Sequence, residues 1–208
     1  MSHPTQYRGE VKRIALAGGI GAGKSTVLDY LRARGFVALD ADEVYADLVE
    51  PGQPLLAALV DAFGTAILTP EAELDRAFVS AVVFHDDTAL ARLNAITHPD
   101  VGRAMRQQLD AVTGQAAFVA IPLLRAEHRH DLSLDEIWSV QVSPEIAVER
   151  LVAQRAMARD EALARISHQM SNDERESIAD VVIWNNTDRD ALRDRIDELL
   201  REGGLGGH

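Results

Sequence analysis

The sequence predicts an α/β fold with a mainly parallel sheet. Short runs of apolar residues, nearly continuous and rich in Val, Ile and Phe, recur along the chain. Such runs are typical of parallel strands that are covered on both faces. Between them lie longer stretches whose apolar residues repeat at helical spacing. Strands that alternate with helices in this way favour a parallel sheet flanked by helices.

Five runs are the expected strands. They cover Lys12–Ala17, Phe36–Asp40, Ala116–Ile121, Glu136–Val142 and Val181–Trp184.

The spacing of apolar residues predicts amphipathic helices between and after these strands. The last one has apolar residues at helical spacing between 192 and 200, and Asp188 stands where its N-cap is expected. His98 and Pro99 read as the turn before a helix that covers Asp100–Val112, because proline suits the first position of a helix.

The chain of 208 residues fits one domain with additions. Its nucleotide-binding core is expected in residues 12–42, 114–142 and 178–202. Residues 43–113 contain helical patterns without a convincing strand, which predicts an insertion that covers the carboxyl edge of the sheet, where open α/β sheets bind ligands. Residues 143–172 form a second helical excursion, rich in arginine, that we expect to act as a lid.

Composition excludes several classes of function. Lys and Arg total 21 against 33 Asp and Glu, a formal charge of −12, which argues against broad binding to nucleic acid or anionic lipid. The absence of cysteine excludes disulfides, thiolate zinc sites and cysteine nucleophiles. Residues 1–12 are polar and no apolar stretch is long enough to cross a bilayer, so a cytoplasmic protein is expected. The oligomeric state is not predicted.

A phosphate-binding loop runs from Gly18 to Thr26. Residues 18–25 match G-x-x-x-x-G-K-[ST] at every fixed position, between an apolar run and a helical pattern, as the motif requires. Glycines let the backbone turn its N–H groups toward phosphate oxygens, and the following helix adds its positive end. Lys24 is expected to reach the β- and γ-phosphates, and the Ser25 hydroxyl to ligate Mg²⁺.

Two acids, Asp40 and Asp42, follow the second expected strand. A hydroxyl that attacks a γ-phosphate needs a hydrogen-bond acceptor, and Asp42 is the candidate general base. The alternative is an N-cap, since a helical pattern begins at Glu43 and aspartate is a favoured cap. Asp40 is a candidate indirect partner of Mg²⁺.

Further motifs, taken in order, resemble the dephospho-CoA kinases. The resemblance extends from about Arg13 to Leu200 and rests on the phosphate loop together with Gly35 to Asp42, Glu50-Pro51-Gly52, Phe63-Gly64, Leu74-Asp75-Arg76, Val83-Phe84, Ile96-Thr97-His98-Pro99, Ile121-Pro122-Leu123-Leu124, Arg150-Leu151-Val152-Ala153-Gln154-Arg155, Arg165-Ile166-Ser167-His168-Gln169 and Ala179-Asp180 with Asn185.

The resemblance implies a P-loop kinase fold with a five-stranded parallel sheet, a helical CoA-binding part and a mobile lid. It also implies transfer of the γ-phosphate of ATP to the ribose 3′-hydroxyl of dephospho-CoA. Asp42, Lys24 and Arg155 are then the catalytic candidates, and Asp42, Arg76 and His98 are the candidates for acceptor binding. The residues expected at ATP are Gly19, Ile20, Gly21, Ala22, Gly23, Lys24, Ser25, Thr26, Arg150, Arg155 and Asn185.

Several of these roles have a plain structural alternative. Arg150 and Arg155 are equally typical of a solvated helix with glutamate partners. A surface arginine at 76, a structural histidine at 98 and a turn asparagine at 185 would look the same in sequence.

Two departures from the family pattern concern the acceptor. The family has threonine before its glycine pair, where this chain has Ala17. The family also has an acid two residues after Pro-Leu-Leu, whereas Arg125, Ala126 and Glu127 follow here. These departures keep open the alternative of a P-loop kinase for another small molecule, a nucleoside or nucleotide. A GTPase or a non-catalytic regulator is disfavoured, because residues 184–188 lack the lysine of a guanine-reading Asn-Lys-x-Asp motif.

Overall fold

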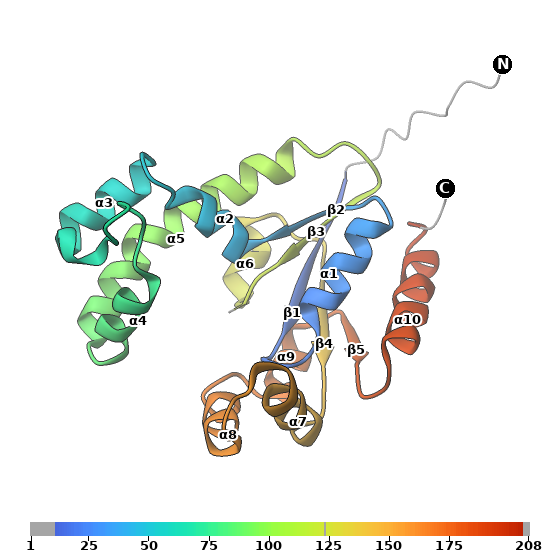
Figure 1. Cartoon of the computed structure of the whole chain (residues 1–208). Coiled ribbons are helices and arrows are strands. Elements are labelled where there is room, and N and C mark those ends of the chain that lie inside the picture. The colour runs from blue at the N-terminus through green and yellow to red at the C-terminus, as the bar shows by residue number, and fades with distance from the viewer. Residues whose placement is uncertain (1–10, 123, 206–208) are drawn as a thin grey trace. The chain divides into compact units, whose positions relative to one another are not determined.

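The computed structural model describes residues 11–122 and 124–205. The sequence predicts no signal peptide in residues 1–12, and most of this segment lies outside the described residues. Leu123 of the Pro-Leu-Leu motif also lies outside them. The chain divides into two compact units (Figure 1). The first contains the residues up to Asp40 together with those from Ala111 onward, and the second contains Ala41–Asp110.

The first unit is built on a five-stranded parallel sheet, which confirms the predicted fold class (Figure 1). The strand order is β2-β3-β1-β4-β5, so that β1 is central. Each predicted strand is present and differs from its expected bounds by at most one residue at either end. The strands are β1 (Lys12–Gly18), β2 (Val37–Asp40), β3 (Ala116–Ala120), β4 (Glu136–Gln141) and β5 (Val181–Trp184).

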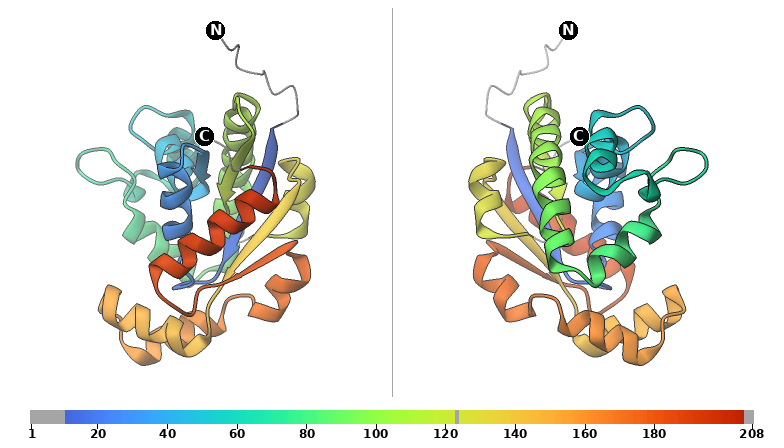
Figure 2. Two further views of the ribbon diagram at one scale, coloured as in Figure 1. Left: turned by 90° about the vertical axis from the view of Figure 1, so that its right-hand side faces the viewer. Right: turned by 90° about the vertical axis from the view of Figure 1, so that its left-hand side faces the viewer.

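Helices lie on both faces of this sheet (Figure 2). Alternate residues of β4 separate the two faces. Trp138 and Val140 join a core shared with α1 and α10, whereas Gln141 faces α9 and donates a hydrogen bond to the Asn172 carbonyl. Phe118 of β3 packs edge-to-face against Trp138 at 5.4 Å between ring centroids. The helices of this unit are α1 (Lys24–Ala33), α6 (Ala126–Asp131), α7 (Pro144–Arg155), α8 (Arg159–Ser167), α9 (Asn172–Ile178) and α10 (Arg189–Glu202).

The predicted N-cap of α10 is confirmed. The Asp188 carboxylate accepts hydrogen bonds from the backbone N–H groups of Asp190 and Ala191 at 3.0 and 2.9 Å. The buried side chains of α10 lie on one stripe that includes Leu192, Ile196 and Leu200. Its amphipathic pattern therefore reflects burial against the sheet core.

The second unit is helical and has its own core. Leu55, Leu59 and Ile67 are among its buried side chains. The only strand-like feature among its residues is an isolated bridge between Leu68 and Leu74. The elements are α2 (Ala41–Leu48), α3 (Pro54–Phe63), the short 3₁₀ helix η1 (Thr65–Ile67), α4 (Arg76–Phe84) and α5 (Asp87–Asp110).

The predicted turn at His98 and Pro99 is wrong, because α5 continues through both residues. A proline inside a helix removes one backbone donor and strains the preceding turn. Here the helix buries Thr97 before the proline and Met105 and Leu109 after it. Burial on both sides of Pro99 offsets the local cost, so the chain does not turn at this point.

Candidate active site

The phosphate-binding loop connects the carboxyl end of β1 to the N-terminus of α1. Gly21 and Gly23 have φ values of 78° and 93°, in the left-handed region that favours glycine. The Ala22 N–H donates to the Gly19 carbonyl at 3.1 Å and closes the turn. Gly23 is the N-cap of α1 and makes no side-chain hydrogen bond to it, so the first N–H groups of the helix point toward a site for an anion.

Asn185 and Arg150 hold the later half of the loop through its carbonyl groups. The Asn185 Nδ2 donates to the Ala22 carbonyl at 2.8 Å, and Asn185 is only 6% exposed. The Arg150 guanidinium donates to the carbonyls of Gly21 at 3.2 Å and of Asn185 at 2.9 Å. Both residues were predicted at ATP, and the structure brings both to the loop that would hold it. Direct contact with ATP stays a prediction.

Gln169 and Arg175 contact the first half of the loop, and neither was predicted as a site residue. The Gln169 Oε1 accepts a hydrogen bond from the Ile20 N–H at 2.9 Å. The Arg175 guanidinium lies against Gly19, where an added Cβ would come within 3.0 Å of its Nη2. Gln169 belongs to a family-like motif, which was a usable signal. Arg175 stands among the charged residues of a short helix, and no feature of the sequence distinguished it as a site residue.

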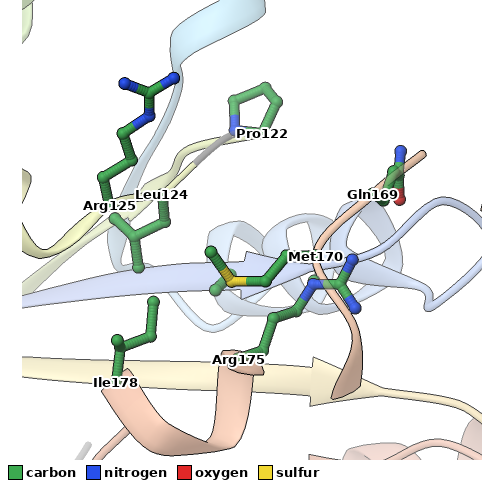
Figure 3. A pocket seen from close by; sticks show the side chains of 9 residues that line it. Pro122, Leu124, Arg125, Gln169, Met170, Arg175 and Ile178 are labelled. Atoms are coloured by element: carbon green, nitrogen blue, oxygen red, sulfur yellow. The ribbon is translucent and has the colours of Figure 1, made fainter. Parts of the chain in front are cut away.

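A cavity of about 210 Å³ opens beside the start of the loop (Figure 3). Leu124, Met170 and Ile178 point into it (Figure 3). Ala17, where the sequence departs from the family pattern, lines this cavity, and so does Arg125, which directly precedes the second departure at Ala126. It is lined by Ala17, Gly18, Pro122, Leu124, Arg125, Gln169, Met170, Arg175 and Ile178.

The two predicted acids lie on different elements. Asp40 ends β2, where it is paired in register with Ala120 of β3, and therefore stands at the same carboxyl edge of the sheet as the phosphate loop. Asp42 is exposed in the first turn of α2. Because α2 begins at Ala41, Asp42 lies inside the helix, and the N-cap alternative for this residue is wrong.

The remaining candidates are exposed side chains on helices. Arg155 is the last residue of α7 in the first unit. Arg76 and His98 belong to the second unit, on α4 and α5. The Arg76 guanidinium lies 5.7 Å from the centroid of the Tyr45 ring, which holds it by a cation–π contact. Lys24 begins α1, and Ser25 follows it with an exposed side chain.

The described residues contain neither a membrane-spanning helix nor a cluster of metal ligands. No helix within 11–122 or 124–205 has the length and apolar character that a membrane span requires. In the same part of the chain, His, Asp and Glu side chains do not gather into a group of three that could hold a metal ion.

Comparison with known proteins identifies relatives along most of the chain. The family model for dephospho-CoA kinase matches residues 12–191. A dephospho-CoA kinase of Corynebacterium glutamicum is 42% identical over 193 residues, which are 91% of this chain and 96% of the relative. A dephospho-CoA kinase of Thermobifida fusca is 41% identical and covers 91% of this chain and 95% of its own.

Solved structures share this fold. A crystal structure of a Thermus thermophilus protein superposes with a TM-score of 0.78 at 31% identity and covers 96% of this chain and all of its own. Shikimate kinase of Acinetobacter baumannii shares the fold alone, with a TM-score of 0.52 at 14% identity, over 94% of this chain and 96% of its own. The phosphate loop, the parallel sheet around it and a family match over nearly the whole described chain lead to one conclusion: the chain belongs to the dephospho-CoA kinase family.

Proposed function

We propose that this chain transfers the γ-phosphoryl group of ATP to the ribose 3′-hydroxyl of dephospho-CoA and releases coenzyme A and ADP, the last step of coenzyme A biosynthesis. The observation that carries the proposal is a complete phosphate-binding loop, held on both flanks by side chains, in a chain that matches the family over residues 12–191. The loop accounts for ATP, and the family accounts for the acceptor.

ATP binds through the backbone of residues 19–26 in this proposal. N–H groups of the loop and of the first turn of α1 surround the phosphates, and Lys24 reaches the β- and γ-phosphates. Arg150 and Asn185 keep the loop in its binding shape through the carbonyls of Gly21 and Ala22. Arg155, at the end of α7, supplies a mobile positive charge over the triphosphate.

Asp42 acts as the general base. It accepts the proton of the 3′-hydroxyl while the hydroxyl oxygen forms its bond to the γ-phosphorus. The bond from that phosphorus to the bridging oxygen breaks at the same time, and its electron pair leaves with ADP. Arg76 and His98 contact the acceptor, because both are exposed on the helical unit that the family uses for CoA.

Mg²⁺ fits the donors that this site offers. It prefers oxygen ligands, usually keeps several waters, and is held by one or two protein groups together with substrate phosphates. The exposed Ser25 hydroxyl in the first turn of α1 is such a donor, and Asp40 at the edge of the sheet can accept hydrogen bonds from bound water. When bound, Mg²⁺ neutralises charge on the phosphate oxygens.

A different small-molecule acceptor, a nucleoside or nucleotide, is the alternative. Ala17 and Arg125 favour testing it, because the first departure from the family pattern and the residue next to the second one line one cavity beside the loop. A panel of acceptors assayed side by side, with ADP release measured in each case, separates the two. ADP release that depends on a nucleoside or nucleotide and not on dephospho-CoA would establish the alternative.

The decisive experiment measures ADP release from Mg-ATP with and without dephospho-CoA. We expect release that depends on dephospho-CoA, and normal ATP binding without such release would refute the proposal. Asp42→Asn is expected to lower kcat by about 10²–10⁴-fold while the Kd of ATP stays unchanged. Asp47→Asn is the matched control, since Asp47 is an exposed acid of the same helix α2. Equal kcat values for the two variants would remove Asp42 from the mechanism.

A further inference from the structure

Arg175 is held in place beside the phosphate loop by a chain of hydrogen bonds. Its Nη1 donates to the Asn172 Oδ1 at 3.3 Å. The Asn172 side chain donates in turn to the Val142 carbonyl at 2.9 Å, and the Asn172 carbonyl accepts from the Gln141 Nε2 at 3.0 Å. Gln141 is completely buried at the end of β4, the strand next to β1. The guanidinium is therefore anchored to the sheet that also carries the loop.

The segment before α9 is tied to the loop as well. Gln169 stands two residues before Ser171, the N-cap of α9. Its side chain accepts a hydrogen bond from the Ile20 N–H of the loop. The start of α9 is thus connected to the loop through Gln169 and to the end of β4 through Asn172. These two connections keep the Arg175 guanidinium against Gly19, where an added Cβ would stand 3.0 Å from its Nη2.

The charges around Arg175 bear on the kind of ligand that it can hold. Among the described residues, no carboxylate oxygen comes within ion-pair distance of its guanidinium, although the backbone neighbour Glu174 acts on it at longer range. Burial lowers the pKa of Arg175 from its ordinary value, yet an arginine still remains protonated at neutral pH. The cavity that Arg175 lines includes Arg125 and no acid. A half-buried cation in such surroundings is suited to an anionic ligand.

The position along the loop indicates which anion. The backbone N–H groups of the loop and of the first turn of α1 surround the α- and β-phosphates of a nucleotide, and the γ-phosphate projects from them toward the acceptor. Arg175 stands at the start of the loop, at Gly19, next to the cavity. The flank formed by Gly21 and Ala22 is already occupied by Arg150 and Asn185. The terminal phosphate is therefore the one that faces Arg175.

We propose that Arg175 is a catalytic residue that contacts the γ-phosphoryl group during its transfer. This inference rests on the proposed function and adds to it a second arginine, placed outside the predicted lid. In the transfer, the acceptor oxygen bonds to the γ-phosphorus, the proton goes to Asp42, and the bridging oxygen leaves on ADP with the bonding electrons. The guanidinium donates hydrogen bonds to the equatorial oxygens, whose negative charge is largest in the transition state.

The position of Arg175 distinguishes it from Arg155. Arg155 is exposed at the end of α7, in the segment predicted to act as a lid. Arg175 is already anchored at the loop without a nucleotide, so its charge is pre-organised. Loss of Arg175 should therefore lower kcat more than it weakens the ground-state binding of ATP or ADP.

The test compares Arg175→Gln and Arg175→Lys with the wild-type protein. We expect Arg175→Gln to lower kcat by about 10²–10³-fold, with the Kd values of ATP and ADP nearly unchanged. Arg175→Lys keeps the charge without the planar fork and should retain an intermediate kcat. Arg201→Gln, an exposed arginine at the end of α10, is the control and should match the wild type. Thermal unfolding of each variant checks that the fold is kept.

A second measurement separates catalysis from loop structure. ADP with aluminium fluoride imitates the transferring phosphoryl group, and the wild-type protein should bind it more tightly than ADP alone. Arg175→Gln should lose this gain and keep the affinity for ADP. An equal loss of affinity for ADP and for the analogue would show that Arg175 only shapes the loop, and would overturn the inference. Guanidinium ions added to Arg175→Ala should raise kcat; no rise, together with unchanged binding of the analogue, would also overturn it.

The outcome is distinguishable from a failure of the proposed function. If the wild-type protein releases no ADP with dephospho-CoA, the acceptor is wrong. If it does, and Arg175→Gln has the same kcat as Arg201→Gln, the inference is wrong and the proposed function stands.

Discussion

Gly23 is the position where one added methyl group should disturb the phosphate loop most. Its φ of 93° lies in the left-handed region. A Cβ at this position would stand 2.3 Å from the Asn185 Nδ2, far inside van der Waals contact. The Asn185 amide cannot simply move aside, because it is buried and donates to the Ala22 carbonyl at 2.8 Å.

The cost of Gly23→Ala has two parts. A left-handed backbone costs an L-residue about 1–2 kcal/mol. Displacing Asn185 breaks a buried hydrogen bond and leaves the Ala22 carbonyl without its partner, at about 1–3 kcal/mol. We therefore expect the free energy of unfolding to fall by about 2–5 kcal/mol. Affinity for ATP should fall as well, since the loop must change shape.

Urea unfolding of matched variants measures the two parts separately. Gly35 has a φ of 86° and nothing within 4 Å of an added Cβ, so Gly35→Ala carries the backbone strain alone. In an Asn185→Ala background the collision is absent, and Gly23→Ala should then cost no more than Gly35→Ala does. The double-mutant cycle should give a coupling of about 1–3 kcal/mol between positions 23 and 185.

Two results would refute this reasoning. One is a Gly23→Ala variant that loses no more stability than Gly35→Ala. The other is strict additivity of the unfolding free-energy changes of Gly23→Ala and Asn185→Ala, which would mean that the Asn185 side chain moves away from an added Cβ without loss of stability.

Three further predictions concern the helices that surround the loop. Arg150→Met removes the donors to the carbonyls of Gly21 and Asn185. It should raise the Kd of ATP about tenfold in calorimetry, which corresponds to about 1.4 kcal/mol. An unchanged Kd would contradict the role of Arg150 in holding the loop. Ser171→Ala removes the N-cap of α9 and should lower stability by about 1 kcal/mol in urea unfolding. Hydrogen bonds from the backbone N–H and hydroxyl of Ser171 lower the pKa of Glu174, so its contribution is present above the ordinary pKa and is lost as the pH falls through the lowered one. Glu174→Gln should therefore lower the melting temperature at neutral pH and have a smaller effect in acid; equal effects at both would count against the capping box.

Local patterns were sufficient for the loop and the strands. Residues 18–25 form a contiguous motif whose glycines, lysine and serine act within one turn of chain, so the sequence alone carries the information. The strands are likewise visible because burial on both faces requires a continuous apolar run. His98 and Pro99 show where such patterns fail. Local chemistry there favours a turn, and the burial of Thr97, Met105 and Leu109 on both sides of Pro99 outweighs it.

Contacts between distant segments were not predictable. Gln169 and Ile20 are 149 residues apart. No local pattern in either segment indicates that they form a hydrogen bond with each other. Arg175 looks like any arginine of a charged helix until Asn172 and the end of β4 fix its direction. The same holds for Ala17 and Arg125, which are far apart in the sequence and which the fold places around one cavity.

By itself, the sequence determined that this chain has a parallel α/β sheet with a phosphate loop at the end of its first strand, because both depend on residues close together in the chain. The family motifs, read in order, also indicated a kinase of dephospho-CoA. Only the tertiary structure decided which side chains surround the loop, because that depends on how helices after β4 and β5 pack against the sheet. Asn185 and Arg150 on one flank and Gln169 and Arg175 on the other are products of that packing.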